Sequence, residues 1–313
     1  MSKACRDPVR EYCSIAMART RKTPADPGPQ EADHLPRAEL FIPDNTTTSL
    51  ALSRCTHLGI GAHADDLEFM AYHGISHCYR EKDQWFGGIT CTDGGGCSRS
   101  GKYADYSDEA MIGLRAEEQR EAARIGQYSF IHQLALKSAT AKNAQSRNQL
   151  VEILAEAIAA CQPEVLYTHN PADSHPTHVA VCLSVIEAIR RLPPEARPLQ
   201  ILGCEVWRSL DWLPPQDKIA LDVSRHPQLA EQLHTCFDTQ IAGGKNYSQA
   251  VIGRSLSNAT FHKANQSDGP SRLWFAMDLT PLARDDSLSL TSFTRDLLQR
   301  FNQNVTQGLA TGH

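Results

Sequence analysis

The sequence predicts an α/β fold in which a mainly parallel sheet lies between two layers of helices. Short apolar runs alternate along the chain with amphipathic stretches of helical periodicity. Polar clusters directly follow two of the apolar runs, as they do where parallel strands end in loops. Together these features favour a three-layer sandwich around one sheet.

The expected strands are short apolar runs bounded by turn-forming or polar residues. They cover residues 57–62, 87–91, 165–168, 200–206, 218–223 and 272–279. The expected helices cover residues 67–80, 114–125, 149–161, 178–189 and 227–237. Gly126 ends the second of these helices, and Pro163 follows the third. The helix at 178–189 is apolar on almost every side, so we expect it to be buried.

The start of the chain differs in composition from the rest. Residues 23–37 contain four prolines and a glycine among polar side chains, which is typical of a linker. We therefore expect an N-terminal arm over residues 1–39 and a single globular domain over residues 40–313. No internal repeat and no low-complexity tract interrupts that domain.

Composition excludes several classes of protein. The 31 Lys and Arg residues against 36 Asp and Glu residues give a net charge of −5, which argues against nucleic-acid binding. No apolar stretch approaches the roughly 18 residues of a membrane-spanning helix. The N-terminus lacks the apolar core of a secretory signal, which predicts a cytoplasmic protein. The ten cysteines include no C-x-x-C pair, so a disulfide framework is not expected.

Two polar clusters follow expected strands. The first includes His63, Asp65 and Asp66, and the second includes His175 and His178. Each cluster alone has a structural explanation: Asp65 and Glu68 have the spacing of a capping box, and the proline after His175 fits the start of a helix. Local sequence does not decide between capping and function.

Taken jointly, the clusters offer two imidazoles and a carboxylate from His63, Asp66 and His178. This is the ligand set of a catalytic zinc that keeps one position open for water. Asp65, beside that set, is suited to take a proton from water. His175 is expected on the same side of its helix as His178, where it can stabilise a developing oxyanion. The predicted chemistry is metal-assisted amide hydrolysis.

Four motifs occur in order along the chain: A-H-x-D-D-x-E at 62–68, T-D-G at 92–94, L-R-x-x-E at 114–118 and P-x-D-x-H-x-x-H at 171–178. In this order they resemble the PIG-L, or LmbE-like, family of zinc-dependent N-deacetylases. The resemblance implies a Rossmann-like fold and a hydrolase that removes an acetyl group from an amino sugar, such as N-acetylglucosamine, or from its conjugate. It also implies one zinc per chain, and homo-oligomers occur in the family.

The resemblance carries over to individual positions. It implies that His63, Asp66 and His178 bind zinc, that Asp65 is the general base and that His175 polarises the substrate or stabilises the tetrahedral intermediate. It places a substrate-contacting arginine at position 115, and Asp93 of the T-D-G motif either faces the pocket or caps a turn. The chain departs from the family pattern at Ala64, Thr177 and His73. None of these departures removes a ligand.

Two other classes of function remain open. Two histidines and a carboxylate are also the ligand set of non-haem Fe(II) oxygenases, although such sites commonly occur on β-barrels. The second alternative is a sugar-binding module without catalysis on a deacetylase scaffold. Aromatic side chains at Trp207, Trp212 and Tyr247 could stack on a sugar, but packing in the core or on the surface is the simpler expectation for each.

Overall fold

A computed structural model describes residue 12, residues 38–267 and residues 269–311. Apart from Tyr12, the predicted N-terminal arm up to residue 37 lies outside the described residues. Tyr12 is buried, and its hydroxyl forms a hydrogen bond with the His132 ring. Among the described residues, no helix is both long enough and apolar enough to cross a membrane.

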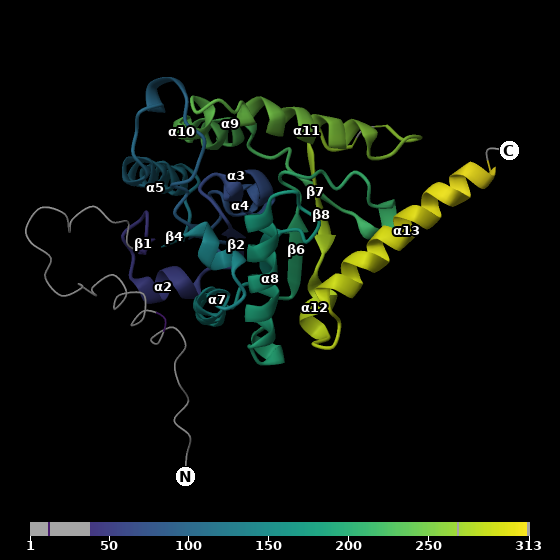
Figure 1. Ribbon diagram of the computed structural model, residues 1–313, viewed down its shortest axis with the longest axis horizontal. Helices are drawn as coiled ribbons and strands as arrows, with labels where there is room; N and C mark the ends of the chain where they lie inside the picture. The colour runs from purple at the N-terminus through teal and green to yellow at the C-terminus, as the bar shows by residue number, and fades with distance from the viewer. Residues whose placement is uncertain (1–11, 13–37, 268, 312–313) are drawn as a thin grey trace, which may run out of the picture.

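One sheet of eight strands, in the order β1-β4-β3-β2-β5-β6-β8-β7, forms the centre of the molecule (Figure 1). Its five central strands, from β4 to β6, are parallel, whereas β1, β8 and β7 pair antiparallel at the two edges. The predicted mainly parallel α/β sheet is therefore confirmed. The strands are β1 (Glu39–Phe41), β2 (His57–Gly61), β3 (Phe86–Thr92), β4 (Phe130–Leu136), β5 (Val165–His169), β6 (Gln200–Cys204), β7 (Ile219–Asp222) and β8 (Leu273–Asp278).

Helices cover both faces of the sheet (Figure 1). Neighbouring residues of a strand point to opposite faces, so Leu166 packs into one apolar cluster and Tyr167 into the other. Side chains of α2 (Thr48–Ser53), α6 (Ser138–Lys142), α7 (Arg147–Cys161), α8 (Pro176–Arg190), α12 (Thr280–Arg284) and α13 (Leu290–Thr311) join the first cluster. Side chains of α3 (Asp66–Met70), α4 (Tyr72–Cys78), α5 (Asp108–Ile125) and α9 (Pro227–Thr235) join the second.

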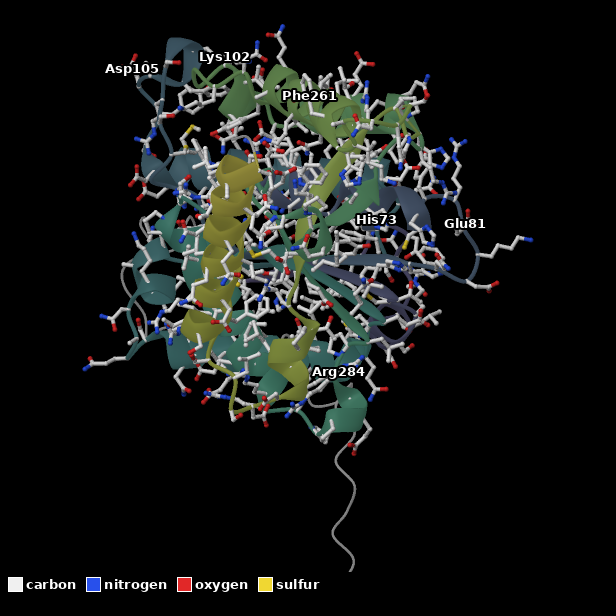
Figure 2. The ribbon with its side chains drawn as sticks, turned by 90° about the vertical axis from the view of Figure 1, so that its right-hand side faces the viewer. His73, Glu81, Lys102, Asp105, Phe261 and Arg284 are labelled. Atoms are coloured by element: carbon white, nitrogen blue, oxygen red, sulfur yellow. The ribbon has the colours of Figure 1, made fainter. Side chains whose placement is uncertain are left out.

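Two further helices, α10 (Asp238–Ile241) and α11 (Tyr247–Phe261), lie beside α9 and α5. In Figure 2, Lys102, Asp105 and the end of α11 at Phe261 lie at one end of the molecule, and Arg284 lies at the other. The parallel strands run toward the first of these ends. Functional side chains are therefore expected there, because ligands of open α/β sheets bind at the carboxyl ends of the strands.

The structure differs from the sequence prediction in several elements, among them helices α2 and α6, which were not expected, and α5, which begins six residues earlier than predicted. Strands β1 and β4 were not expected; β4 interrupts its apolar residues with His132 and Gln133, both of which are buried. The helix expected at 67–80 is divided into α3 and α4 by Ala71, whose φ of −110° and ψ of 14° are not helical. Beyond residue 225, where the sequence pattern was weak, α10 to α13 account for most of the chain.

Gly74 in α4 fits tightly against the sheet. A Cβ at this position would lie 2.6 Å from Cε2 of Tyr167, a side chain that is fully buried. Gly113 in α5 is a matched control, because a Cβ there would meet no atom within 4 Å. The helix therefore lies closest to the sheet where it has no side chain.

We predict opposite effects for alanine at these two glycines. Gly74→Ala should lower the free energy of unfolding by about 1–3 kcal/mol, because the new methyl group overpacks the core. Gly113→Ala should raise it by up to about 1 kcal/mol through helix propensity. Urea titration followed by circular dichroism measures both, and an unchanged or more stable Gly74→Ala variant would contradict the close packing.

Candidate active site

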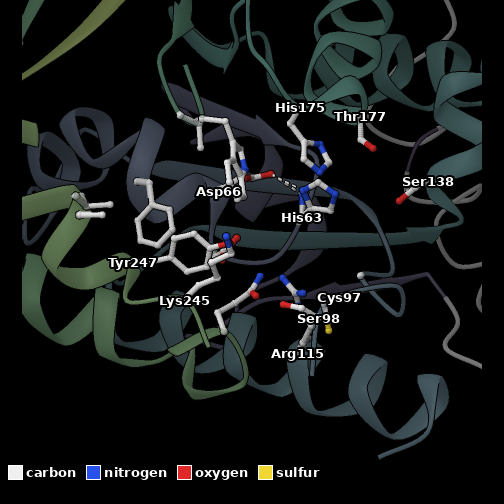
Figure 3. Close-up of a pocket in the computed structure, with 18 of the residues that line it drawn as sticks. His63, Asp66, Cys97, Ser98, Arg115, Ser138, His175, Thr177, Lys245 and Tyr247 are labelled. Carbon is white, nitrogen blue, oxygen red and sulfur yellow. Dashed lines mark hydrogen bonds and ion pairs between the residues drawn. The ribbon is translucent and has the colours of Figure 1, made fainter. Parts of the chain in front are cut away.

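A cavity of about 650 Å³ lies at the carboxyl ends of the parallel strands (Figure 3). The loops after three strands line it: His63 and Asp65 follow β2, Gly94 and residues 96–98 follow β3, and His175 follows β5. These loops are adjacent because β3, β2 and β5 are neighbours in the sheet. The two polar clusters singled out in the sequence therefore meet in one place.

The loop after β2 contains an uncommon backbone conformation. Asp65 has φ 90° and ψ −27°, a left-handed conformation that is costly for a residue other than glycine. Asp65 does occupy the position before α3, but its side chain makes no capping hydrogen bond. The Glu68 carboxylate does not reach back as in a capping box; it accepts hydrogen bonds from Tyr128 Oη and Gln119 Nε2, both at 2.8 Å. Capping therefore does not explain the motif.

Helix α5 holds this turn from the other side. Arg115 Nη2 donates to the carbonyl oxygen of Ala64 at 2.9 Å, and Gln119 Oε1 accepts from the Asp65 N–H at 3.4 Å. Both side chains are buried. The strained conformation at Asp65 is thus supported by two hydrogen bonds to the peptide group between Ala64 and Asp65, one to its carbonyl oxygen and one from its N–H.

The side chains of His63, Asp66 and His178 converge on one point. His63 Nδ1 lies 3.2 Å from Asp66 Oδ2, and His178 Nε2 lies 3.3 Å from Asp66 Oδ1. The two ring nitrogens are 3.3 Å apart. Two sets of donor atoms have the spacing of a metal site, and both include His178. One set adds His63 and His175, and the other adds Asp66 and His169. The structure brings together all three of the ligands predicted from the sequence.

Other side chains fix the orientation of His178. Asp173 Oδ2 lies 3.5 Å from His178 Nδ1, which leaves Nε2 to face Asp66 and His63. The His169 ring is stacked on the His178 ring with centroids 3.8 Å apart, and its Nε2 accepts a hydrogen bond from the Ala62 N–H at 2.9 Å. Asp173 is therefore placed to orient the ring, as carboxylates beside metal-binding histidines do, whereas His169 supports it by stacking.

Residues 58–189, which include this entire set, match the family model described as PIG-L: GlcNAc-PI de-N-acetylase. The match covers 132 of the 313 residues and includes all four motifs. The de-N-acetylase activity that the description names agrees with the prediction from those motifs. No curated protein sequence matches the chain significantly.

Solved structures share the fold of this chain at low sequence identity. GalB, the 4-carboxy-2-hydroxymuconate hydratase from Pseudomonas putida, has a TM-score of 0.54 and 15% identity over 71% of this chain and 95% of that chain. The conserved protein TT1542 from Thermus thermophilus has a TM-score of 0.53 and 17% identity over 71% of this chain and 94% of that chain. N,N'-diacetylchitobiose deacetylase from Pyrococcus horikoshii has a TM-score of 0.53 and 16% identity, covering 78% and 90%. Because one of these is titled a hydratase, the fold alone does not decide the reaction.

Burial and neighbouring charges shift the pKa values of residues in the candidate site. Burial opposes ionisation of Asp66, but His178 and His169 outweigh it and hold the pKa of Asp66 well below its usual range. Burial also opposes a charged His178, yet the Asp66 carboxylate raises the pKa of His178 to about 9. The Asp66 carboxylate therefore retains its charge, and the donor set attracts a positive charge.

Asp65 and His175 are shifted toward their neutral forms. Burial raises the pKa of Asp65 well above its usual range; Arg115 opposes that shift, and the charges of Asp66 and Glu68 add to it. Burial, together with positive charge at His178 and His63, lowers the pKa of His175 to about 4. A neutral imidazole at His175 still has one N–H to donate.

The remaining predicted positions have different outcomes. Arg115 lines the cavity. Asp93 is absent from the lining: its Oδ1 accepts from the Gly95 N–H at 3.2 Å and its Oδ2 pairs with Lys137 Nζ at 2.7 Å, so it caps the turn. His73 bonds to Tyr167 Oη at 2.8 Å on the face of α4, away from the cavity lining.

One wall of the cavity is only partly anticipated by the sequence, which offers Trp207 and Tyr247 as possible sugar-stacking residues but favours packing for both and does not single out Lys245 or Arg254. Trp207, Lys245, Tyr247 and Arg254 line it, whereas Trp212 instead packs its ring on Phe301. The Trp207 ring lies 6.0 Å from the His175 ring at an angle of 29°, and it is 42% exposed, which is high for a tryptophan. An exposed aromatic ring was the available signal, but neither composition nor periodicity shows exposure.

We predict that Gln119 is required for both stability and turnover. Gln119→Leu leaves the buried Glu68 carboxylate with one partner fewer and removes the acceptor from the Asp65 N–H. The free energy of unfolding should fall by about 1–3 kcal/mol. Turnover should also fall, because the turn that carries Asp65 loosens.

Denaturant titration and steady-state kinetics measure the two effects. Gln149→Leu, at an exposed position of α7 outside the cavity lining, is the matched control and should change neither quantity. A Gln119→Leu protein with wild-type stability and turnover would contradict the role assigned to this hydrogen-bond network.

Proposed function

We propose that this protein is a zinc-dependent hydrolase that removes an acetyl group from the nitrogen of an amino sugar or its conjugate. One observation carries the proposal: donor atoms of His63, Asp66 and His178 lie 3.2 to 3.3 Å apart, directly beside the buried Asp65. The amino-sugar class is supported by the description of the matching family model, which names GlcNAc-PI.

The donor set fits a zinc ion. Zinc–nitrogen and zinc–oxygen bonds of about 2.0–2.1 Å place the corners of a tetrahedron roughly 3.3–3.4 Å apart. The His63 Nδ1–His178 Nε2 separation of 3.3 Å agrees with that spacing. Each of these nitrogens also has an Asp66 oxygen at a similar distance, Oδ2 at 3.2 Å from His63 and Oδ1 at 3.3 Å from His178. We assign His63 Nδ1, His178 Nε2 and the Asp66 carboxylate as the ligands. When bound there, a divalent cation supplies the positive charge that polarises the amide carbonyl, activates water and favours the ionised form of Asp65.

Asp65 is the general base in this proposal. Its ionised carboxylate takes a proton from the attacking water and later delivers it to the leaving amine nitrogen, so no proton is left over. The left-handed backbone at Asp65 and the hydrogen bonds from α5 hold the residue beside Asp66. The same geometry keeps the two adjacent carboxylates in different roles, one as base and one as ligand.

His175 holds the oxygen of the reacting amide. Its ring lies 4.9 Å from the His63 ring and 4.6 Å from the His178 ring, measured between centroids, and it lines the cavity. Because the imidazole is neutral, its N–H can donate to the carbonyl oxygen and follow the negative charge that develops on it. Thr177 replaces the carboxylate common at that position, and a neutral donor does not need one.

We also propose a cytoplasmic location. All eight cysteines in the part of the chain with described coordinates are free, and six of them are buried. Free cysteines are typical of a reducing compartment.

The two neighbouring carboxylates give a sharp test. Asp65→Asn should retain about one zinc per chain and lose at least about a hundredfold in turnover, because it cannot accept a proton. Asp66→Asn should lose the metal, because the ligand charge is gone. Asp211→Asn, at an exposed aspartate outside the cavity lining, is the control.

The measurements are metal content by mass spectrometry after dialysis and amine release from N-acetyl sugars. A turnover of Asp65→Asn near wild type would refute the mechanism. Oxygen consumption with a 2-oxo acid and bound iron would favour the oxygenase alternative, and tight sugar binding without amine release would favour the non-catalytic one.

A further inference from the structure

Four cationic side chains line the cavity: Arg115, Lys142, Lys245 and Arg254. The carboxylates in the lining are Asp65 and Asp66. The cavity therefore has an excess of positive charge, even before a divalent cation is added, in a chain whose net charge is −5. A deacetylase acting on a neutral sugar has no need of such an excess.

Lys245 and Arg254 contact the same short segment after β6. Lys245 Nζ lies 5.4 Å from the centroid of the Trp207 ring. Arg254 Nη1 donates to the carbonyl oxygen of Val206, and its guanidinium lies 5.6 Å from the centroid of the Trp274 ring. Lys245 therefore lies beside the Trp207 ring, and Arg254 lies beside the Trp274 ring and the backbone of Val206. The Trp207 ring is in turn stacked on the His175 ring. Figure 3 shows Lys245 and Tyr247 together on the opposite side of the cavity from His63 and His175.

Ion pairs with carboxylates do not occupy Lys245 or Arg254. Within the described part of the chain, no carboxylate oxygen lies within 4.0 Å of the Lys245 ammonium or the Arg254 guanidinium. Arg254 lies near the buried Glu205, whose pKa burial raises and Arg254 lowers in part. Glu205 is otherwise satisfied by Asn258 Nδ2 and by the N–H groups of Leu210 and Phe275. Donor capacity of both cations remains directed at the cavity.

We propose that Lys245 and Arg254 form a subsite for an anionic group, a phosphate or a carboxylate, carried by the substrate. The inference rests on the proposed function: with the N-acetyl group at His175 and the metal ligands, the sugar ring lies against Trp207 and its anionic substituent reaches the two cations. Lysine supplies a point charge and arginine a planar fork, a combination suited to phosphate or carboxylate oxygens. Both residues lie outside the segment 58–189 that matches the family model.

The test compares three N-acetyl sugars on the zinc-loaded full chain: neutral N-acetylglucosamine, its 6-phosphate, and N-acetylmuramic acid, which carries a carboxylate. Amine release gives kcat/KM for each. Calorimetric binding to the Asp65→Asn chain gives affinities that do not depend on turnover. The variants are Lys245→Met, Arg254→Met and Lys245→Arg, with Lys263→Met as the control at an exposed lysine outside the cavity lining.

We expect at least one anionic sugar to exceed the neutral one about tenfold or more in kcat/KM and in affinity. Lys245→Met and Arg254→Met should each remove most of that preference while the neutral sugar changes less than about twofold. Lys245→Arg should restore it, and Lys263→Met should leave it unchanged. The preference should weaken as ionic strength rises. The sugar that shows the preference, the 6-phosphate or the carboxylate-bearing N-acetylmuramic acid, identifies the anion that the subsite binds.

Equal kcat/KM and affinity for neutral and anionic sugars, in wild type and variants alike, would overturn the subsite while leaving the deacetylase proposal standing. A preference for the anionic sugars that survives in both Met variants would overturn it too. Binding of an anionic sugar that depends on Lys245, without amine release from any sugar, would support the subsite and refute the deacetylase. These outcomes separate the failure of one proposal from the failure of the other.

Discussion

A single buried carboxylate, that of Asp66, joins the two loops on which the site depends. It lies 3.2 Å from one imidazole of its own loop and 3.3 Å from two imidazoles that come from the end of β5 and the region after it, at His169 and His178. A buried charge of this kind is tolerated only when it is paired or bound to metal. The neighbouring parallel strands β2 and β5 bring the two loops together, and Asp66 fixes them in one arrangement.

That constraint explains the strain beside it. For Asp66 to point at the imidazoles and begin α3, the preceding residue must turn sharply, and Asp65 takes the left-handed conformation. Strain of roughly 1–3 kcal/mol persists only where surrounding contacts fix it, and Arg115 and Gln119 of α5 supply those contacts. The sheet positions the ligands, and α5 positions the base. Two separate elements therefore define the reacting geometry.

The sequence is sufficient to predict the sheet and the chemistry because both depend on local signals. Strand β2 and the motif after it are contiguous, and the ligand residues lie at the start of α3 and α8, where a pattern of residue types can be recognised. Strand β4 was missed because His132 and Gln133 are polar residues that tertiary packing buries. The cavity wall is not assembled from the sequence for a related reason, although the sequence offers Trp207 and Tyr247 as possible sugar-stacking residues and leaves only Lys245 and Arg254 unconsidered. Its position depends on the packing of α11 against β8 and α9, which no local pattern records.

Helix α5 also supports the segment that carries Lys245. The segment that carries Lys245 is attached mainly to α5 and to the loop after β3: Glu118 accepts from the Thr239 N–H and hydroxyl at 2.7 and 2.6 Å, and Ser100 Oγ donates to the Ala242 carbonyl oxygen at 3.0 Å. Glu118 lies one turn from Arg115 on α5. The helix that holds the turn at Asp65 thus also holds the wall opposite it. The wall is also linked to the ligand set at its other end, because the Trp207 N–H donates to Asp173 Oδ2 at 3.2 Å and that oxygen lies 3.5 Å from His178 Nδ1. The link uses the backbone of Trp207, so side chains on the wall can change without removing it.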